Sequence, residues 1–208
     1  MRNAQRQPGE RRARVGIMSL TTSDGLSFRE LVFSDLERYQ PGKQPTWRGV
    51  LARCLSTPGM VASLILRAQQ SATRRGHTAV ASILRTIGSI LVGADFVPGL
   101  EVGPGLWMPH PNSVVIGNGA TIGANVTVGA GVTFGAKNPT GASGEFPVIC
   151  DGAIILTHAV VAGAVRVGQH AQVGANSVVL DDVADYAVVF GVPATKVADR
   201  DGRIPGAG

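Results

Sequence analysis

The chain has 208 residues, a formal net charge of +5, and a composition that is 44% hydrophobic but only 5% aromatic. This length allows one or two domains with a core of aliphatic side chains. Most of the positive charge comes from five arginines in residues 1–15, so the rest of the chain is nearly neutral. It lacks the basic face and the stacking aromatics of a nucleic-acid-binding protein, and no nucleic-acid partner is expected.

Residues 1–20 are predicted to be a disordered basic arm, because a charged, polar terminus has little to bury. No apolar run follows it, as a targeting peptide would require. The longest apolar stretch, residues 83–100, is interrupted by two charged residues and a proline, which argues against a membrane span. The two cysteines, Cys54 and Cys150, make neither a disulfide framework nor a CxxC zinc motif. We expect a soluble, cytoplasmic protein.

Residues 21–93 are predicted to form a helical domain. Ser27 and Glu30 have the spacing of a capping box, and Pro58 suits the first position of a helix. Apolar residues recur at helical spacing in four segments, which begin near Ser27, Thr46, Thr57 and Thr78. The last of these segments closes at Gly93.

From residue 96 onward, a bulky apolar residue recurs at every sixth position, apart from two interruptions. The series contains Phe96, Val102, Met108, Ile116, Ile122, Val128, Phe134, Ile149, Ile155, Val161, Val167, Val173 and Val179. Neither a helix nor an ordinary strand has this period, which is the signature of a parallel β-helix with three short strands in each coil. The following position is mostly glycine or another small residue, which we expect to permit tight corners.

The predicted fold class is therefore α+β, with an N-terminal helical region followed by a left-handed parallel β-helix of hexapeptide repeats over residues 94–198. Residues 199–208 are predicted to be a flexible tail. A coil stack has open strand edges at both ends, and these must be covered to prevent edge pairing. We expect the helices to cap the first coil and the segment from Tyr186 onward to cap the last.

The two interruptions contain the polar residues most suggestive of chemistry. The shorter one, at Pro109–Asn112, places His110 between two prolines that restrict its backbone. Asp95 lies close to one coil upstream, so the two side chains could face each other across adjacent coils. An aspartate bonded to one imidazole nitrogen leaves the other nitrogen free as a general base. The alternatives are a corner histidine without a role and a junction aspartate that binds free backbone amides.

Residues 94–117 resemble the start of the coil domain of the serine O-acetyltransferase family, and Gly191-Val192-Pro193-Ala194 resembles its C-terminal signature. The similarity covers roughly residues 27–198. It implies that His110 deprotonates the acceptor hydroxyl, that Asp95 orients His110, and that the alkoxide attacks acetyl-CoA directly. These two residues are the predicted catalytic pair of an O-acetyltransferase.

The predicted acceptor-binding positions depart from the family pattern. The family has an aspartate before its catalytic histidine and an Arg-His pair at the end of its long loop, where this chain has Pro109, Glu145 and Phe146. A helical aspartate of the family aligns approximately with Gln44. A free amino acid needs a cation for its carboxylate and an anion for its ammonium group. We therefore expect an acceptor other than free L-serine, such as a saccharide or another hydroxyl compound.

The resemblance also implies a donor site and an assembly. The pantetheine of acetyl-CoA would lie in a groove between adjacent subunits of a homotrimer, which could pair into a hexamer. The matching cofactor-binding positions are Ala136, Thr157, Ala175, Gly191 and Lys196. Small residues in such a groove let the pantetheine amides reach the backbone.

Two alternatives to this function remain open. One is a true serine O-acetyltransferase, and the other is a non-catalytic trimeric scaffold, which would have no need of the pair formed by Asp95 and His110. A zinc site of the kind found in hexapeptide carbonic anhydrases would require three histidines at suitable spacing. His158 and His170 are twelve residues apart and do not fit that pattern, so no metal is expected.

Overall fold

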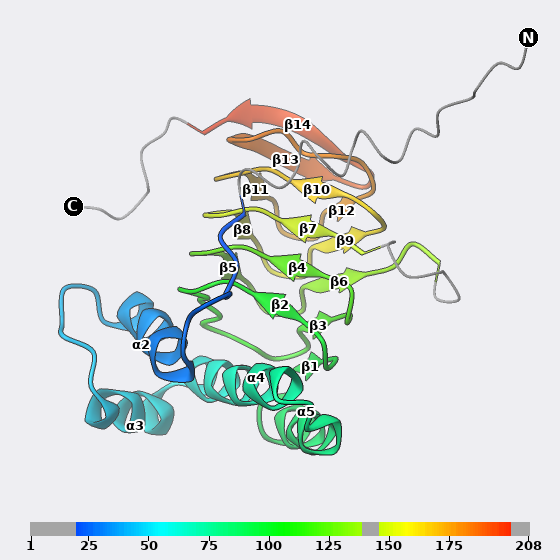
Figure 1. The fold of residues 1–208 in the computed structure, drawn as a ribbon. Helices are drawn as coiled ribbons and strands as arrows, with labels where there is room; N and C mark the ends of the chain where they lie inside the picture. Colours follow the sequence, from blue (N-terminus) through cyan, green and yellow to red (C-terminus); the bar gives the residue numbers. More distant parts are fainter. Residues whose placement is uncertain (1–19, 139–145, 201–208) are drawn as a thin grey trace, which may run out of the picture.

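The computed structural model describes residues 20–138 and 146–200. A layer of helices lies at one end of a stack of β-coils (Figure 1). The helices are α2 (Phe28–Tyr39), α3 (Trp47–Ser56), α4 (Pro58–Arg74) and α5 (Thr78–Val92). Residues 1–19 of the predicted arm and residues 201–208 of the predicted tail lie outside the described residues.

The helices begin where the sequence predicts, and α5 ends at the predicted Gly93. The side chain of Ser27 accepts a hydrogen bond from the backbone of Glu30, whose carboxylate binds the Ser27 backbone in return. Thr46 caps α3 in the same way by accepting a hydrogen bond from Gly49. Gly93 ends α5 with a φ of 66°, a conformation that glycine adopts without the steric cost of a Cβ atom. The four predicted helices are confirmed.

The strands of the described ranges are two to six residues long. They are β1 (Asp95–Phe96), β2 (Glu101–Val102), β3 (Val115–Ile116), β4 (Thr121–Ile122), β5 (Thr127–Val128), β6 (Thr133–Gly135), β7 (Val148–Ile149), β8 (Ile154–Ile155), β9 (Val160–Ala162), β10 (Arg166–Val167), β11 (Gln172–Val173), β12 (Val178–Val179), β13 (Ala187–Gly191) and β14 (Ala194–Asp199).

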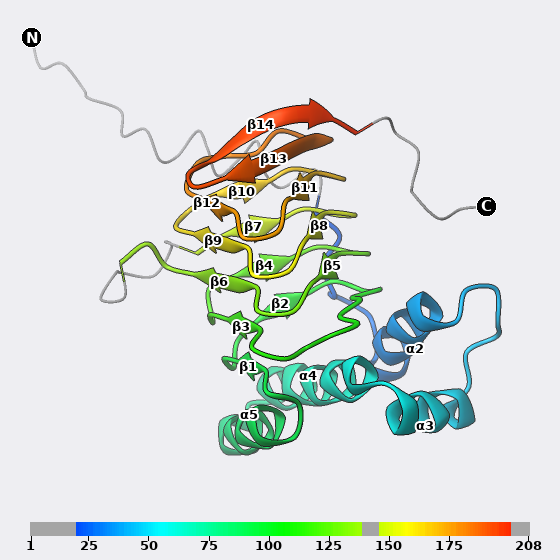
Figure 2. The ribbon, with the colours of Figure 1, turned by 180° about the vertical axis from the view of Figure 1, so that it is seen from behind.

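These strands form three sheets, one along each side of the stack. The first sheet has the order β1-β3-β6-β9-β12, the second β2-β4-β7-β10 and the third β5-β8-β11-β13-β14. Figure 2 shows the first sheet rising directly above α5. Neighbouring strands are parallel, except that β14 runs antiparallel to β13. Equivalent repeat positions are in register, as Phe96, Ile116 and Phe134 show.

The interior of the stack is built from the residues of the six-residue period. All thirteen inward positions, from Phe96 to Val179, are at most 1% exposed. Full burial of one such aliphatic side chain stabilises a fold by about 1.5–3 kcal/mol. The predicted parallel β-helix of hexapeptide repeats following a helical region is confirmed.

The glycines that follow the inward residues have a different role from the predicted one. A Cβ atom on Gly129 would lie 2.6 Å from the backbone nitrogen of Thr157, and one on Gly123 would lie 2.9 Å from that of Asp151. These glycines therefore allow close packing of the next coil. Several corners instead take their left-handed backbone from non-glycine residues, including Asn125 and His158 with φ of 57° and 58°.

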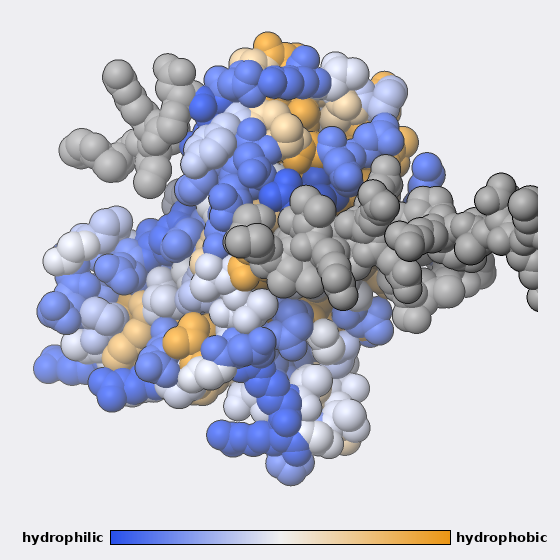
Figure 3. Space-filling view, turned by 45° about the horizontal axis from the view of Figure 1, so that its top comes forward, coloured by the Kyte–Doolittle hydropathy of each residue, from blue (hydrophilic) through white to orange (hydrophobic). Residues whose placement is uncertain are grey.

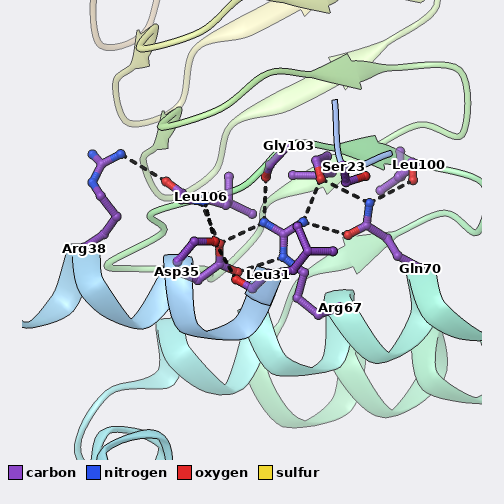
Figure 4. A network of polar contacts seen from close by, with 12 residues as sticks. Ser23, Leu31, Asp35, Arg38, Arg67, Gln70, Leu100, Gly103 and Leu106 are labelled. Atoms are coloured by element: carbon purple, nitrogen blue, oxygen red, sulfur yellow. Dashed lines mark hydrogen bonds and ion pairs between the residues drawn. The ribbon is translucent and has the colours of Figure 1, made fainter. Parts of the chain in front are cut away.

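Both ends of the stack are covered, as predicted. At the helical end, Arg67 of α4 donates hydrogen bonds of 2.7 Å to the carbonyl oxygens of Val102 and Gly103, and it forms a bidentate ion pair with Asp35 of α2 (Figure 4). The side chains of Arg67 and Asp35 are fully buried. At the opposite end, β14 covers the edge of β13. In the described ranges, no helix has the length and apolar character needed to cross a membrane.

Candidate active site

His110 lies in the turn between the third side of the first coil and β3. Trp107, three residues before His110, forms a parallel bridge with Thr127 of β5, which places Trp107 on the third sheet. His110 is exposed. In the described part of the chain, its imidazole has no hydrogen-bond partner. Both ring nitrogens are thus open to a ligand.

The backbone ahead of His110 is held by the helical layer. The hydroxyl of Tyr39, at the end of α2, donates a hydrogen bond of 3.0 Å to the carbonyl oxygen of Met108. Gly59, in the first turn of α4, lies so close to the same oxygen that a Cβ atom would overlap it. Sequence reasoning missed both residues, although a glycine in the first turn of a helix is itself a signal of close approach.

The backbone after His110 is tied to the coils below and above. The amide of Ser113 donates to the carbonyl oxygen of Gly93 at 2.8 Å, and the amide of Gly131 donates to that of Asn112 at 2.9 Å. The histidine is therefore an exposed side chain on an anchored turn. This arrangement suits a group that must meet a reactant at a fixed position.

Asp95 lies at the start of β1, and its backbone amide donates a hydrogen bond of 2.8 Å to Val114 in the coil above. It thus occupies the coil adjacent to the His110 turn, as the spacing predicts. Its carboxylate binds Arg85 of α5, with Nε–Oδ1 and Nη2–Oδ2 distances of 2.5 and 2.7 Å. The Arg85 guanidinium lowers the pKa of the Asp95 carboxyl group by hydrogen bonding.

Among the described residues, no hydrogen bond joins Asp95 to His110, so their contact stays a prediction. Sequence reasoning treated Arg85 only as an interruption of an apolar stretch and missed its place beside the site. The available signal was its position ten residues before Asp95, two helical turns from the end of the helix that leads into β1.

Phe146 lies at the other end of the strands of the first sheet. Its ring occupies the space where Cβ atoms of Gly117 and Gly119 would lie, in the corner that follows β3. The ring is partly buried against the core and anchors the end of the longer interruption of the repeat, which lies between Gly135 and Val148. Within a single subunit, Phe146 and His110 therefore lie at opposite edges of the first sheet and do not meet. Glu145 lies outside the described residues, Pro109 is in the His110 turn, and Gln44 is exposed between α2 and α3.

The predicted donor positions lie at two edges of the first sheet, the edge where its strands begin, near His110, and the edge where they end, near Phe146. Thr157 and Ala175 lie in corners stacked above the His110 turn, where the amide of Asn176 donates to the Thr157 carbonyl oxygen at 3.0 Å. Gly191 ends β13 on this edge, with its amide 3.1 Å from the hydroxyl of Ser177.

Ala136 follows β6 on the opposite edge. Lys196 lies in β14 and pairs with Asp199 at 2.7 Å. The surface around this end of the stack mixes polar and apolar residues (Figure 3), and Val192 and Val197 are among its exposed apolar side chains.

The histidines considered for zinc do not come together. His158 packs its ring on Gly131, whereas His170 packs on Gly152 and stacks on Tyr186 with ring centroids 5.2 Å apart. No group of three or more histidine, cysteine, aspartate or glutamate residues within the described ranges could hold a metal ion.

Comparisons with known proteins support one family. No protein-family model matches the sequence. The chain is 33% identical to the serine acetyltransferase of Bacillus pumilus over 162 residues, which cover 78% of this chain and 74% of that protein. It is 35% identical to the serine acetyltransferase of Mycobacterium tuberculosis over 74% of this chain and 59% of that protein. The match to the Escherichia coli serine acetyltransferase, at 32% identity, covers 63% of this chain and about half of that protein, 48%.

Solved structures agree with these relatives. The serine acetyltransferase of Neisseria gonorrhoeae superposes with a TM-score of 0.74 at 31% identity, covering 83% of this chain and 66% of that one. The soybean serine acetyltransferase complexed with serine superposes with a TM-score of 0.74 at 30% identity, covering 82% of this chain and 70% of that one. A serine acetyltransferase in complex with CoA gives a TM-score of 0.71 at 28% identity, covering 82% and 70%. Together with the shared fold and the anchored His110 turn, these similarities show that the chain belongs to the serine acetyltransferase family of acyltransferases.

Proposed function

We propose that this protein is an acetyl-CoA-dependent O-acetyltransferase that uses His110 as a general base. The observation that carries the proposal is the His110 turn, where an exposed imidazole stands on a backbone tied to α2, to the α5–β1 link and to the next coil. A relative solved in complex with CoA supports the choice of acyl donor. The cytoplasmic location stays a prediction from the sequence.

The proposed reaction needs no covalent enzyme intermediate. His110 takes the proton from the acceptor hydroxyl, and the resulting alkoxide attacks the thioester carbonyl carbon of acetyl-CoA. The tetrahedral intermediate collapses, the C–S bond breaks, and the CoA thiolate takes up the proton from the imidazolium. Backbone amides near the site would stabilise the oxyanion. Asp95 would orient the imidazole and stabilise its protonated form, in a contact that tightens when the substrates bind.

We propose an acceptor other than free L-serine. Serine would need a cation and an anion at the acceptor site. Phe146 instead presents an uncharged ring seated on two glycines, and Pro109 and Gln44 are uncharged as well. Serine itself is the main alternative, because the relatives are serine acetyltransferases and one solved relative contains serine.

We propose a homotrimer of left-handed β-helices, because the candidate residues lie on two edges of one sheet. His110, Thr157 and Ala175 lie where its strands begin, and Phe146 and Ala136 lie where they end. One side of a coil spans roughly 15–20 Å at about 3.3 Å per residue, so the two edges can complete one site only between neighbouring subunits. The outward residues of the first sheet beyond Asp95 are uncharged: Val115, Thr133, Val160 and Val178. A trimer mass in solution, with a hexamer as the larger alternative, checks this assembly.

A thiol-release assay with acetyl-CoA tests the activity. The acceptor panel contains L-serine, L-homoserine, neutral sugars and amino sugars. With the best acceptor, His110→Ala is expected to lower kcat by about 100-fold or more. His77→Ala, which changes an exposed histidine between α4 and α5, serves as the matched control and should retain full turnover.

The outcomes separate the alternatives. Full turnover by His110→Ala would show that the base is assigned wrongly. If L-serine is the best acceptor, the protein is a serine acetyltransferase and the inference from Phe146 and Pro109 is wrong. Absence of thiol release with every acceptor would favour the non-catalytic trimeric scaffold.

A further inference from the structure

We propose that Arg85 is a positioning residue of this site, which holds Asp95 and limits how strongly Asp95 can stabilise the protonated imidazole of His110. The inference rests on the proposed function, because it requires His110 to act as the base. It goes beyond that function by adding a residue from the helical domain to the catalytic unit.

The contact between Arg85 and Asp95 is a bidentate ion pair between a guanidinium and a carboxylate. Arg85 donates from Nε and from Nη2 to the two carboxylate oxygens of Asp95, at 2.5 and 2.7 Å. Such a bidentate pair fixes the orientation of the carboxylate as well as its position. Each carboxylate oxygen can accept a further hydrogen bond, so the pair leaves Asp95 able to receive an imidazole N–H.

The two elements that carry this pair are held rigidly. Only two residues, Gly93 and Ala94, separate the end of α5 from β1, and Ala94 is buried. On its other side, α5 packs on α4, where a Cβ atom on the buried Gly88 would lie 3.4 Å from the side chain of Ile65. The amide of Ser113, in the His110 turn, donates to the Gly93 carbonyl oxygen. Arg85, Asp95 and the His110 turn are thus tied to one short segment.

The charge of Arg85 opposes protonation of His110. A free Asp95 carboxylate would attract an imidazolium strongly, whereas a carboxylate already paired with a guanidinium attracts it less. Two further titratable groups of the described residues lie near this turn: Tyr39 of α2, which binds Met108, and His158, which packs on Gly131 from the next corner of the stack. Burial raises the pKa of the Tyr39 hydroxyl, so Tyr39 stays neutral and does not compete with this effect.

The test compares Arg85→Met with Arg85→Lys. Methionine removes the charge and keeps an unbranched side chain. Lysine keeps the charge but lacks the planar guanidinium that binds both carboxylate oxygens. For Arg85→Met we expect kcat to fall about tenfold, with the KM for acetyl-CoA unchanged. We also expect the acid limb of the pH profile of kcat/KM to move to higher pH, because the unpaired Asp95 carboxylate stabilises the imidazolium. Arg85→Lys should lower kcat while leaving the acid limb close to that of the wild type.

A matched control is available on the neighbouring helix. Arg74 of α4 forms an ion pair of 3.5 Å with Glu101 of β2, at a side-chain exposure of 32% compared with 40% for Arg85. This pair also joins a helix to the first coil, but it lies in the second sheet, away from the His110 turn. Arg74→Met should change neither kcat nor the acid limb, and circular dichroism verifies that each variant is folded.

A second readout does not depend on turnover. The chain has four histidines, and the NMR signal of His110 can be assigned by its loss in His110→Asn. The titration midpoint of His110 should rise in Arg85→Met and fall in Asp95→Asn. If the wild type acetylates no acceptor while these shifts occur, the proposed function fails and the coupling between Arg85 and His110 stands.

Two results would overturn the role of Arg85. The first is an unchanged acid limb and an unchanged His110 midpoint in a folded Arg85→Met variant. The second is a raised KM for the acceptor with kcat and the acid limb unaltered, because Arg85 would then bind the acceptor directly.

Discussion

The interior of the coil and its junction with the helices are held by different interactions. Inside the coil, aliphatic residues repeat at one spacing, and any apolar side chain of similar volume suits a given position. At the junction, single donors meet single carbonyl oxygens, as Arg67 does with Val102 and Gly103. The repeat therefore tolerates substitution, whereas the junction depends on particular residues. The His110 turn lies at the boundary and is anchored to both.

Removing one partner of the buried ion pair between Arg67 and Asp35 should cause the largest loss of stability. Arg67→Met leaves the fully buried Asp35 without its partner, which typically costs about 3–5 kcal/mol. We expect the free energy of unfolding, measured by urea denaturation, to fall by this amount. The double variant Asp35→Leu with Arg67→Met should be less destabilised than Arg67→Met alone, because no buried charge remains. Equal losses in the two variants would show that the unpaired charge of Asp35 is not the cause of the destabilisation.

A change at the His110 turn, where the helices meet the coil, should cause a smaller loss of stability together with a loss of activity. Tyr39→Phe removes the hydrogen bond to Met108 and leaves a carbonyl oxygen unsatisfied, at a cost of about 1–3 kcal/mol. Because Met108 lies two residues before His110, we also expect a lower kcat with little change in the KM for acetyl-CoA. Phe28→Leu, which changes a ring at the start of the same helix, serves as a control. A kcat equal to that of the wild type would show that the turn does not need Tyr39.

The coil interior should tolerate a conservative change. Ile155 is fully buried at a repeat position, and Ile155→Val removes one methyl group at a cost of about 0.5–1.5 kcal/mol. The expected result is a small shift in the urea midpoint with unchanged kcat. A loss as large as that of Arg67→Met would remove the distinction between the repeat and the junction.

The same distinction explains what the sequence could predict. The coil follows from its period, because every inward position meets the same environment, and the helices follow from local caps such as Ser27 with Glu30. The pairs Asp35 with Arg67 and Asp95 with Arg85 lie 32 and 10 residues apart. Which residues pair depends on how each helix is rotated about its axis against the coil. A repeat period in the sequence carries no information about that rotation.

The site was predicted in the same uneven way. Spacing placed Asp95 one coil from the His110 turn, but it could not show that an arginine holds the carboxylate. A related contact joins Thr21 to Asp151, where the backbone amide of Thr21 donates a hydrogen bond of 2.9 Å to the Oδ1 atom of Asp151. It joins residues 130 positions apart and has no local signal in the sequence.

The smallest expected effect is the pH dependence of the Arg85–Asp95 pair. The pKa of Asp95 is lowered in the folded state by Arg85, so the pair contributes stability above the unfolded-state pKa of about 3.9. That contribution is lost as the pH falls through the folded-state pKa. The side chains are 40% and 33% exposed, so solvent screening limits the pair to less than about 1 kcal/mol. Urea midpoints of the wild type and Asp95→Asn should differ at pH 6 and converge only as the pH falls below the folded-state pKa of Asp95, where the carboxyl group is protonated in both states. A difference that persisted at low pH would mean that Asp95 stabilises the fold through uncharged contacts, and the tie between α5 and β1 would then not depend on Arg85.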